Sequence, residues 1–216
     1  MMTKLPLCAL AVGVMLITGP VAQAGDMKMS HAHMGHVLTS WNGTPNNAGL
    51  MTTAMDEATI ALQHATAATK KTDDLGWMQM HTAHVVHAVD PTKVDKGPGL
   101  GYGLIKASQG VAKHIGAAAA SGDASGNIKT HAVHVAASAN NAVARASSIL
   151  RLADDVKGAT SAKEAAVFVM DIKALSSQII EGVDANGDGK ITWHEGEGGL
   201  NQSLKHANIM AKGEGL

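Results

Sequence analysis

The chain alternates between long Ala-rich stretches, in which apolar residues recur every three or four positions, and short stretches rich in Gly, Pro and Asp. A recurrence of three to four places the apolar side chains on one face of a helix. Few runs of β-branched residues interrupt this pattern. It predicts helices over the following ranges: 48–70, 73–89, 102–120, 127–157, 160–183 and 193–211.

The segments between these ranges contain residues that begin or end helices. Residues 90–101 (DPTKVDKGPGLG) and 121–127 (SGDASGN) are rich in Pro, Gly and Asp, which favour loops. Thr72 is expected to cap one helix, and either Thr160 or Ser161 another, with Glu164 in capping-box position relative to Ser161. Most loops are short, so neighbouring helices should pack antiparallel. The sequence therefore predicts an all-α protein, an antiparallel helical bundle.

Histidines recur when the chain is compared with itself at a shift of 50 residues. The shift aligns three pairs: His64 with His114, His81 with His131, and His84 with His134. The segment HTAHV at 81–85 then lies over HAVHV at 131–135. We interpret the match as a duplicated helical hairpin, which would supply a four-helix core.

Helix geometry predicts that each hairpin gathers three imidazoles. At about 1.5 Å per residue, His64 lies roughly 9 Å from the turn and His81 roughly 12 Å from it. Antiparallel packing would therefore bring His64 level with His81 and His84. In contrast, His87 has no counterpart at the shift and points furthest from the apolar face, so we expect it at the surface.

These imidazoles are candidate ligands for a transition metal, because neutral imidazole binds zinc, copper, nickel and iron. By the same count of residues, the second hairpin would gather His114, His131 and His134. The six candidates are His64, His81, His84, His114, His131 and His134. Three nitrogens from two helices would form a three-coordinate or open four-coordinate site. The Glu-x-x-His pattern of di-iron bundles is absent. A structural role, in which inward histidines bind backbone carbonyls, stays open.

Residues 25–47 are polar and lack helical periodicity, which predicts a flexible arm. Within it, MKMSHAHMGH interleaves methionines and histidines: Met27, Met29, Met34, His31, His33 and His36. Thioethers favour Cu(I), and imidazoles accept Cu(II) or zinc. The tract is similar to copper-handling segments, and we interpret it as a metal-loading tract. A disordered arm without ligand function is the alternative.

The segment DANGDGKITWHE, residues 184–195, resembles an EF-hand calcium loop. The resemblance assigns the calcium ligands to Asp184, Asn186, Asp188, Lys190 through its backbone carbonyl, Thr192 and Glu195. Gly189 stands at the sixth position, where such a loop turns sharply. The resemblance implies a Ca²⁺ site in a helix–loop–helix within residues 158–216. It ends after the loop, where glycines between 196 and 199 replace the start of an outgoing helix.

Residues 1–24 are interpreted as a secretory signal peptide, because Lys4 precedes an apolar run and the small-residue cleavage pattern AQA. The single cysteine, Cys8, lies in this segment, so the mature chain would hold no thiolate metal site and no c-type haem. Removing Lys4 changes the formal net charge from −1 to −2, and no Lys/Arg cluster indicates nucleic-acid binding. No second apolar run reaches the roughly 20 residues of a membrane span.

Taken together, these patterns predict a periplasmic or secreted protein in which residues 48–157 form the histidine-containing bundle. We expect a metal-binding protein for storage, delivery or resistance, with copper favoured over zinc or nickel, rather than an enzyme. One alternative is a redox protein with histidine-ligated copper or b-type haem. The other is a calcium-stabilised interaction module with structural histidines. The partners are metal ions, and the sequence identifies no protein partner for metal transfer.

Overall fold

The computed structural model describes residues 28–216, so the expected signal peptide and Met27 lie outside the described residues. The helices are α1 (Met29–Leu38), α2 (Leu50–Ala68), α3 (Leu75–Val89), α4 (Leu104–Ala120), α5 (Gly126–Gly158), α6 (Ala162–Glu181) and α7 (Leu200–Glu214). A single 3-10 turn, η1 (Pro45–Asn47), lies between α1 and α2. The part of the chain from 28 onward contains no strand, and the prediction of an all-α bundle is confirmed.

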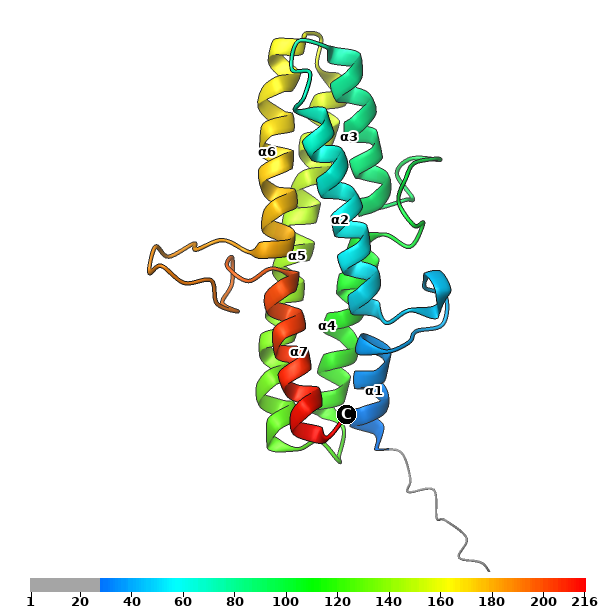
Figure 1. Ribbon diagram of the computed structural model, residues 1–216, viewed down its shortest axis with the longest axis vertical. Coiled ribbons are helices and arrows are strands. Elements are labelled where there is room, and N and C mark those ends of the chain that lie inside the picture. The colour runs from blue at the N-terminus through cyan, green and yellow to red at the C-terminus, as the bar shows by residue number, and fades with distance from the viewer. Residues whose placement is uncertain (1–27) are drawn as a thin grey trace, which may run out of the picture.

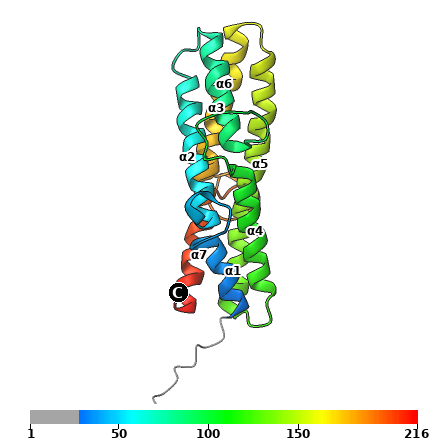
Figure 2. The ribbon, with the colours of Figure 1, turned by 90° about the vertical axis from the view of Figure 1, so that its right-hand side faces the viewer.

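The bundle is elongated and consists of two halves that share α5 (Figures 1 and 2). In Figure 1, α2, α3 and α6 surround the upper part of α5, and α1, α4 and α7 surround its lower part. The repeated hairpins, α2–α3 and α4–α5, both form. They lie mainly end to end, so each half of the bundle is completed by other helices. Long loops leave the bundle near its middle, at 39–49, 90–103 and 182–199.

Local chemistry explains most of the helix boundaries. Ser161 caps α6 by accepting a hydrogen bond from the Glu164 N–H at 3.3 Å, as the capping-box pattern predicted. The cap of α3 was predicted wrongly. Asp74, and not Thr72, caps this helix, because its carboxylate accepts a bond from the Trp77 N–H at 2.9 Å.

Two further expectations need correction. Residues 29–38 form helix α1 where a flexible arm was expected, because Met34 and Val37 share a helical face that packs into the core. At the other end of the chain, α7 begins at Leu200 rather than at residue 193. Gly196 has a φ of +80°, which a helix cannot contain, so the glycines after the loop delay the helix.

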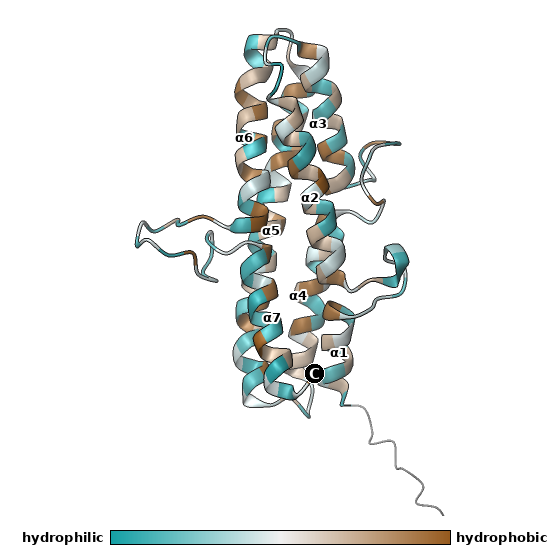
Figure 3. Ribbon diagram, in the orientation of Figure 1, coloured by the Kyte–Doolittle hydropathy of each residue, from teal (hydrophilic) through white to brown (hydrophobic). Residues whose placement is uncertain are grey.

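The core is built from Ala, Val, Ile, Leu and Met side chains between the helices. Figure 3 shows that each helix carries both hydrophobic and hydrophilic residues, as expected for helices buried on one side. Within residues 28–216, no helix is long and apolar enough to cross a membrane.

The loop 90–103 is anchored by two buried polar side chains. The Glu57 carboxylate accepts bonds from the N–H groups of Tyr102 and Gly103 at 3.1 and 2.9 Å, at the start of α4. His87 is only 9% exposed, and its Nδ1 accepts a bond from the Gly99 N–H at 3.1 Å. The expectation that His87 lies at the surface is therefore wrong, because the loop covers the outward side of α3.

Candidate metal centres

Three groups of three histidines lie close together in the described part of the chain. They are the α1–α4 triad (His33, His36 and His114), the α2–α3 triad (His64, His81 and His84) and the α5–α7 triad (His131, His134 and His206). In each triad, two histidines three residues apart on one helix meet a third histidine on a facing helix. We call this third residue the central histidine. Each triad could hold a metal ion.

The α2–α3 triad forms within one hairpin, as the heights of its residues above the turn predicted. The Nδ1 atom of the central His64 lies 3.1 Å from Nδ1 of His81 and 3.3 Å from Nδ1 of His84. The i,i+3 spacing places both α3 histidines on the side of that helix that faces α2.

The second predicted group does not form, because His114 does not join His131 and His134. The central residue of the α5–α7 triad is instead His206, whose Nδ1 lies 3.0 Å from that of His131 and 3.3 Å from that of His134. The side chain of Gln202, one turn earlier on α7, lies 3.2 Å from the outer nitrogen, Nε2, of His206. Here α7 takes the position that the sequence analysis assigned to α4.

His114 completes a triad with the segment that was expected to be an arm. Its Nδ1 lies 3.2 Å from Nδ1 of His33 and 3.3 Å from Nδ1 of His36, both on α1. The available signal was the H-x-x-H spacing of these two residues, which matches that of the pairs at 81–84 and 131–134. Gly35 and the polar residues around this pair disfavoured the prediction of a helix there.

Hydrogen bonding alone does not satisfy these nitrogens. A neutral Nδ1 carries either one hydrogen or one lone pair. The central Nδ1 has two close nitrogen neighbours, but it can form a good N–H···N hydrogen bond with only one of them. A cation between the three rings would accept all three lone pairs. An ion with bonds of about 2.0 Å holds its nitrogens about 3.3 Å apart in a tetrahedral site and about 3.5 Å apart in a trigonal one, and both values are close to the separations from the central Nδ1.

The central imidazoles favour the neutral form that a metal requires. Burial is the main cause that lowers the pKa of His206 to about 4, with smaller contributions from the other two imidazoles of its triad and from Lys205. Burial, followed by the neighbouring histidines, also lowers the pKa of the central residues His64 and His114. At neutral pH the central imidazoles are therefore uncharged, and each has one ring nitrogen with a lone pair for an ion.

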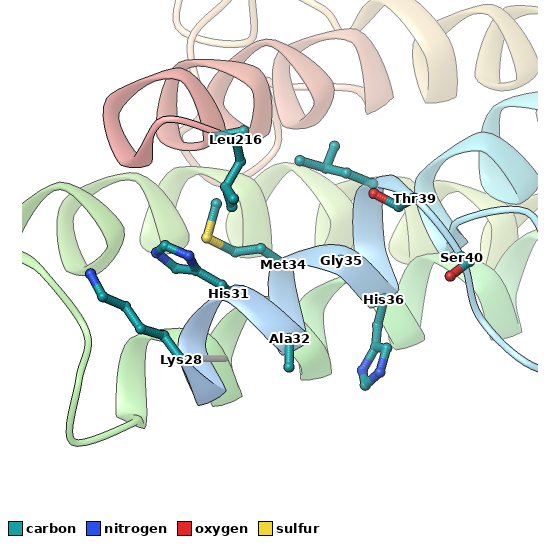
Figure 4. Close-up of a pocket in the computed structure, with 11 residues that line it drawn as sticks. Lys28, His31, Ala32, Met34, Gly35, His36, Thr39, Ser40 and Leu216 are labelled. Atoms are coloured by element: carbon teal, nitrogen blue, oxygen red, sulfur yellow. The ribbon is translucent and has the colours of Figure 1, made fainter. Parts of the chain in front are cut away.

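The remaining residues of the expected loading tract point in different directions. Met34 is fully buried, Met29 is 60% exposed, and His31 Nε2 lies 3.3 Å from a Glu214 carboxylate oxygen. In Figure 4, His31 and Met34 project toward a pocket of about 720 Å³ near Leu216, and His36 projects to another side of α1. The described residues of the tract thus do not form a common ligand cluster.

The calcium-like loop protrudes from the middle of the bundle (Figure 1). Asp184 accepts bonds from the backbone N–H groups of Gly187 and Gly189, both at 2.8 Å, and its loop neighbours Asp188 and Lys190 are exposed. Glu195 is also exposed. No group of His, Asp or Glu with metal-like spacing forms in the described part of this loop.

A different carboxylate reaches into that loop. Glu197 is 2% exposed, and its carboxylate accepts bonds from Asn186 Nδ2 at 2.6 Å and from the Thr192 hydroxyl at 2.5 Å. Glu197 is not among the ligands that the EF-hand resemblance implies, because Glu197 lies two positions beyond the usual last ligand.

No protein-family model matches the chain, and no curated protein or solved structure matches it. The histidine geometry therefore carries the functional argument.

Proposed function

We propose that this protein is an exported metal-binding protein that holds one transition-metal ion in each of its three histidine triads, for storage or delivery. In each triad, the Nδ1 atoms of two histidines lie 3.0 to 3.3 Å from Nδ1 of the central histidine. This repeated convergence of three nitrogens is the observation that carries the proposal. One such group could be a fortuitous contact between polar side chains. Three groups of the same construction indicate a common purpose.

Copper is the favoured ion. All the donors in a triad are imidazole nitrogens, which exclude the hard cations Mg²⁺ and Ca²⁺ and suit copper, zinc and nickel. The methionines at 27 and 29 precede the first histidines, and thioethers bind copper in its reduced state. A b-type haem does not fit within a triad, because its two axial histidines must face each other across the macrocycle, and here the imidazoles touch directly.

Metal analysis of the purified protein tests the proposal. We expect three copper ions per chain, and one fewer in each of the variants His64→Ala, His114→Ala and His206→Ala. The control His31→Gln removes an imidazole outside the triads and retains a donor for Glu214, so it should keep all three ions. Unchanged metal content in all three central-histidine variants would rule out the proposal.

Calcium binding in the loop 184–195 is a second proposal, which rests on the EF-hand resemblance. Its structural support is that the Glu197 carboxylate binds Asn186 and Thr192, the third and ninth positions of the resemblance. Calorimetric titration with Ca²⁺ should show binding that Asp184→Asn weakens. Comparison of Glu195→Gln with Glu197→Gln identifies which carboxylate is the ligand, and no heat of binding in the wild-type protein would refute the proposal.

A further inference from the structure

Every tryptophan in the chain lies against a histidine triad. The ring-centroid distances are 4.7 and 4.5 Å for Trp41 to His36 and His114, 4.4 Å for Trp77 to His81, and 4.3 Å for Trp193 to His134. The three indoles reach the triads from different places: the loop after α1, the first turn of α3, and the loop before α7. Three unrelated local structures therefore each place an indole beside a histidine triad.

Core packing accounts for only part of this placement. The chain contains three Trp but only one Tyr and one Phe. Trp41 packs against the margin of the hydrophobic core, as Phe168 does, whereas Trp77 and Trp193 do not belong to the described core or its margin. None of the tryptophans is fully buried, and each is half-buried beside imidazoles that are mostly half-buried themselves. Each indole contacts one or two imidazoles of its triad.

Each triad offers three histidine nitrogens to an ion. Among residues 28–216, no carboxylate and no fourth histidine joins the three histidines of any triad. Zinc with three protein ligands usually completes a tetrahedron with water. A π face offers no lone pair for such a bond and occupies space that water needs, yet it attracts a cation held close to it. These conditions suit an ion that is satisfied by three nitrogens, and Cu(I) is such an ion.

From this arrangement we infer that the three tryptophans are part of the metal sites, and that they make each triad select Cu(I) over Zn²⁺. The inference rests on the proposed function and adds to it the oxidation state of the ion and a role for the indoles. The indole shields the three-coordinate ion from water, so its removal weakens Cu(I) binding and leaves Zn²⁺ binding unchanged or stronger.

The three sites should differ in how much they depend on the indole. Trp41 contacts two imidazoles of its triad, and Trp193 stacks on His134 with an angle of 22° between the rings. Trp77 contacts one imidazole, its Nε1 donates to a backbone carbonyl at 2.8 Å, and Lys71 Nζ already lies 4.1 Å from its ring centroid. A π face that already interacts with an ammonium group attracts a second cation more weakly. Replacement of Trp77 should therefore have the smallest effect on Cu(I) affinity.

Competition titrations with a chromophoric Cu(I) chelator under anaerobic conditions test the inference on the full mature chain. We expect Trp41→Leu and Trp193→Leu each to weaken one of three Cu(I) sites by about tenfold, and Trp77→Leu by about threefold. Parallel titrations with Zn²⁺ should show no loss of affinity. Phe168→Leu is the matched control, because it removes an aromatic ring away from the triads and should change neither metal.

Two outcomes separate this inference from the proposed function. If the wild-type chain binds three ions and all three tryptophan variants keep its ratio of Cu(I) to Zn²⁺ affinity, the indoles only pack against the rings and the inference is wrong. If the wild-type chain binds neither metal, the proposed function itself fails. If a variant does not fold, the fluorescence of the wild-type chain provides the test, excited at a wavelength that tryptophan absorbs and Tyr102 does not. All three indoles lie beside triads, so this emission should change with each of three equivalents of Cu(I), and constant emission during loading would overturn the inference.

Discussion

The α2–α3 triad and the α5–α7 triad have nearly the same geometry but are assembled in different ways. In the first, the central His64 is 17 and 20 residues from its two neighbours; in the second, His206 is 75 and 72 residues away. The Nδ1 separations nevertheless agree to within 0.1 Å, at 3.1 and 3.3 Å against 3.0 and 3.3 Å. A tight hairpin builds the one site, and the docking of a distant helix builds the other.

The difference shows that a remote site depends on whatever holds the distant helix. The loop before α7 is fastened to α5 by Arg145, which donates to the carbonyls of Gly196, Glu197 and Gly198 at 2.6 to 3.0 Å. Asn141 adds bonds to His194 O and from the Gly196 N–H. The hairpin site needs no such clamp, because its turn closes only a short loop.

Metal removal should therefore destabilise the protein most through the remote sites. At a free metal concentration 100 times the Kd, each site stabilises the folded state by about 2.7 kcal/mol, less any binding to the unfolded chain. The unfolded α2–α3 segment brings its three histidines close in sequence and should retain more of that binding. We expect His206→Ala to remove more of the metal-dependent stability in denaturant titrations than His64→Ala, and equal losses would contradict this distinction.

Replacing the clamp should separate the two sites. Arg145→Met leaves several buried carbonyls without a donor, and we expect a loss of about 3 kcal/mol in the free energy of unfolding. In metal titrations the α5–α7 triad should weaken and the α2–α3 triad should keep its affinity. Arg151→Met is the control, since Arg151 is exposed and, among residues 28–216, its side chain bonds to the nearby Ser148 hydroxyl alone.

The α1–α4 triad offers a second remote site for comparison. An ion bound by His33, His36 and His114 links α1 to α4, whereas without an ion α1 is held by the buried Met34 and Val37 and by polar contacts such as the bond from the Ser30 N–H to Asp123. We expect metal loading to slow amide hydrogen exchange in α1 by at least about tenfold, and to slow it less in α3. Equal slowing in both helices would mean that the ions stabilise the bundle only as a whole.

Acid should destabilise the metal-free protein, and we expect this effect to be the smallest of the four. The folded-state pKa of His206, about 4, lies below its ordinary value of 6.5. The unfolded state therefore takes up the proton first, and stability that is complete above pH 6.5 declines as the pH falls toward 4. Solvent screening limits the effect to about 1 kcal/mol. In chelator-treated protein, His206→Gln should flatten this decline between pH 7 and 5 more than His31→Gln, whose ring lies outside the triads.

Much of this architecture follows from local chemistry that the sequence displays. Apolar spacing predicted α2 to α6 to within a few residues, because a helix with one buried face repeats every three to four positions. The same regularity predicted the α2–α3 triad, since an antiparallel turn leaves few ways to align two adjacent helices. The cap at Ser161 followed for the same reason: its partner is three residues away.

Only the tertiary structure decided which helices face each other across longer distances. His114 and His131 lie on adjacent helices, yet one faces α1 and the other faces α7. No local rule distinguishes these faces, because the choice depends on the end-to-end stacking of the hairpins and on the loop that Arg145 holds. The H-x-x-H spacing was determined by the sequence alone. In the α1–α4 and α5–α7 triads, the third imidazole was selected by packing between segments that are far apart in the chain.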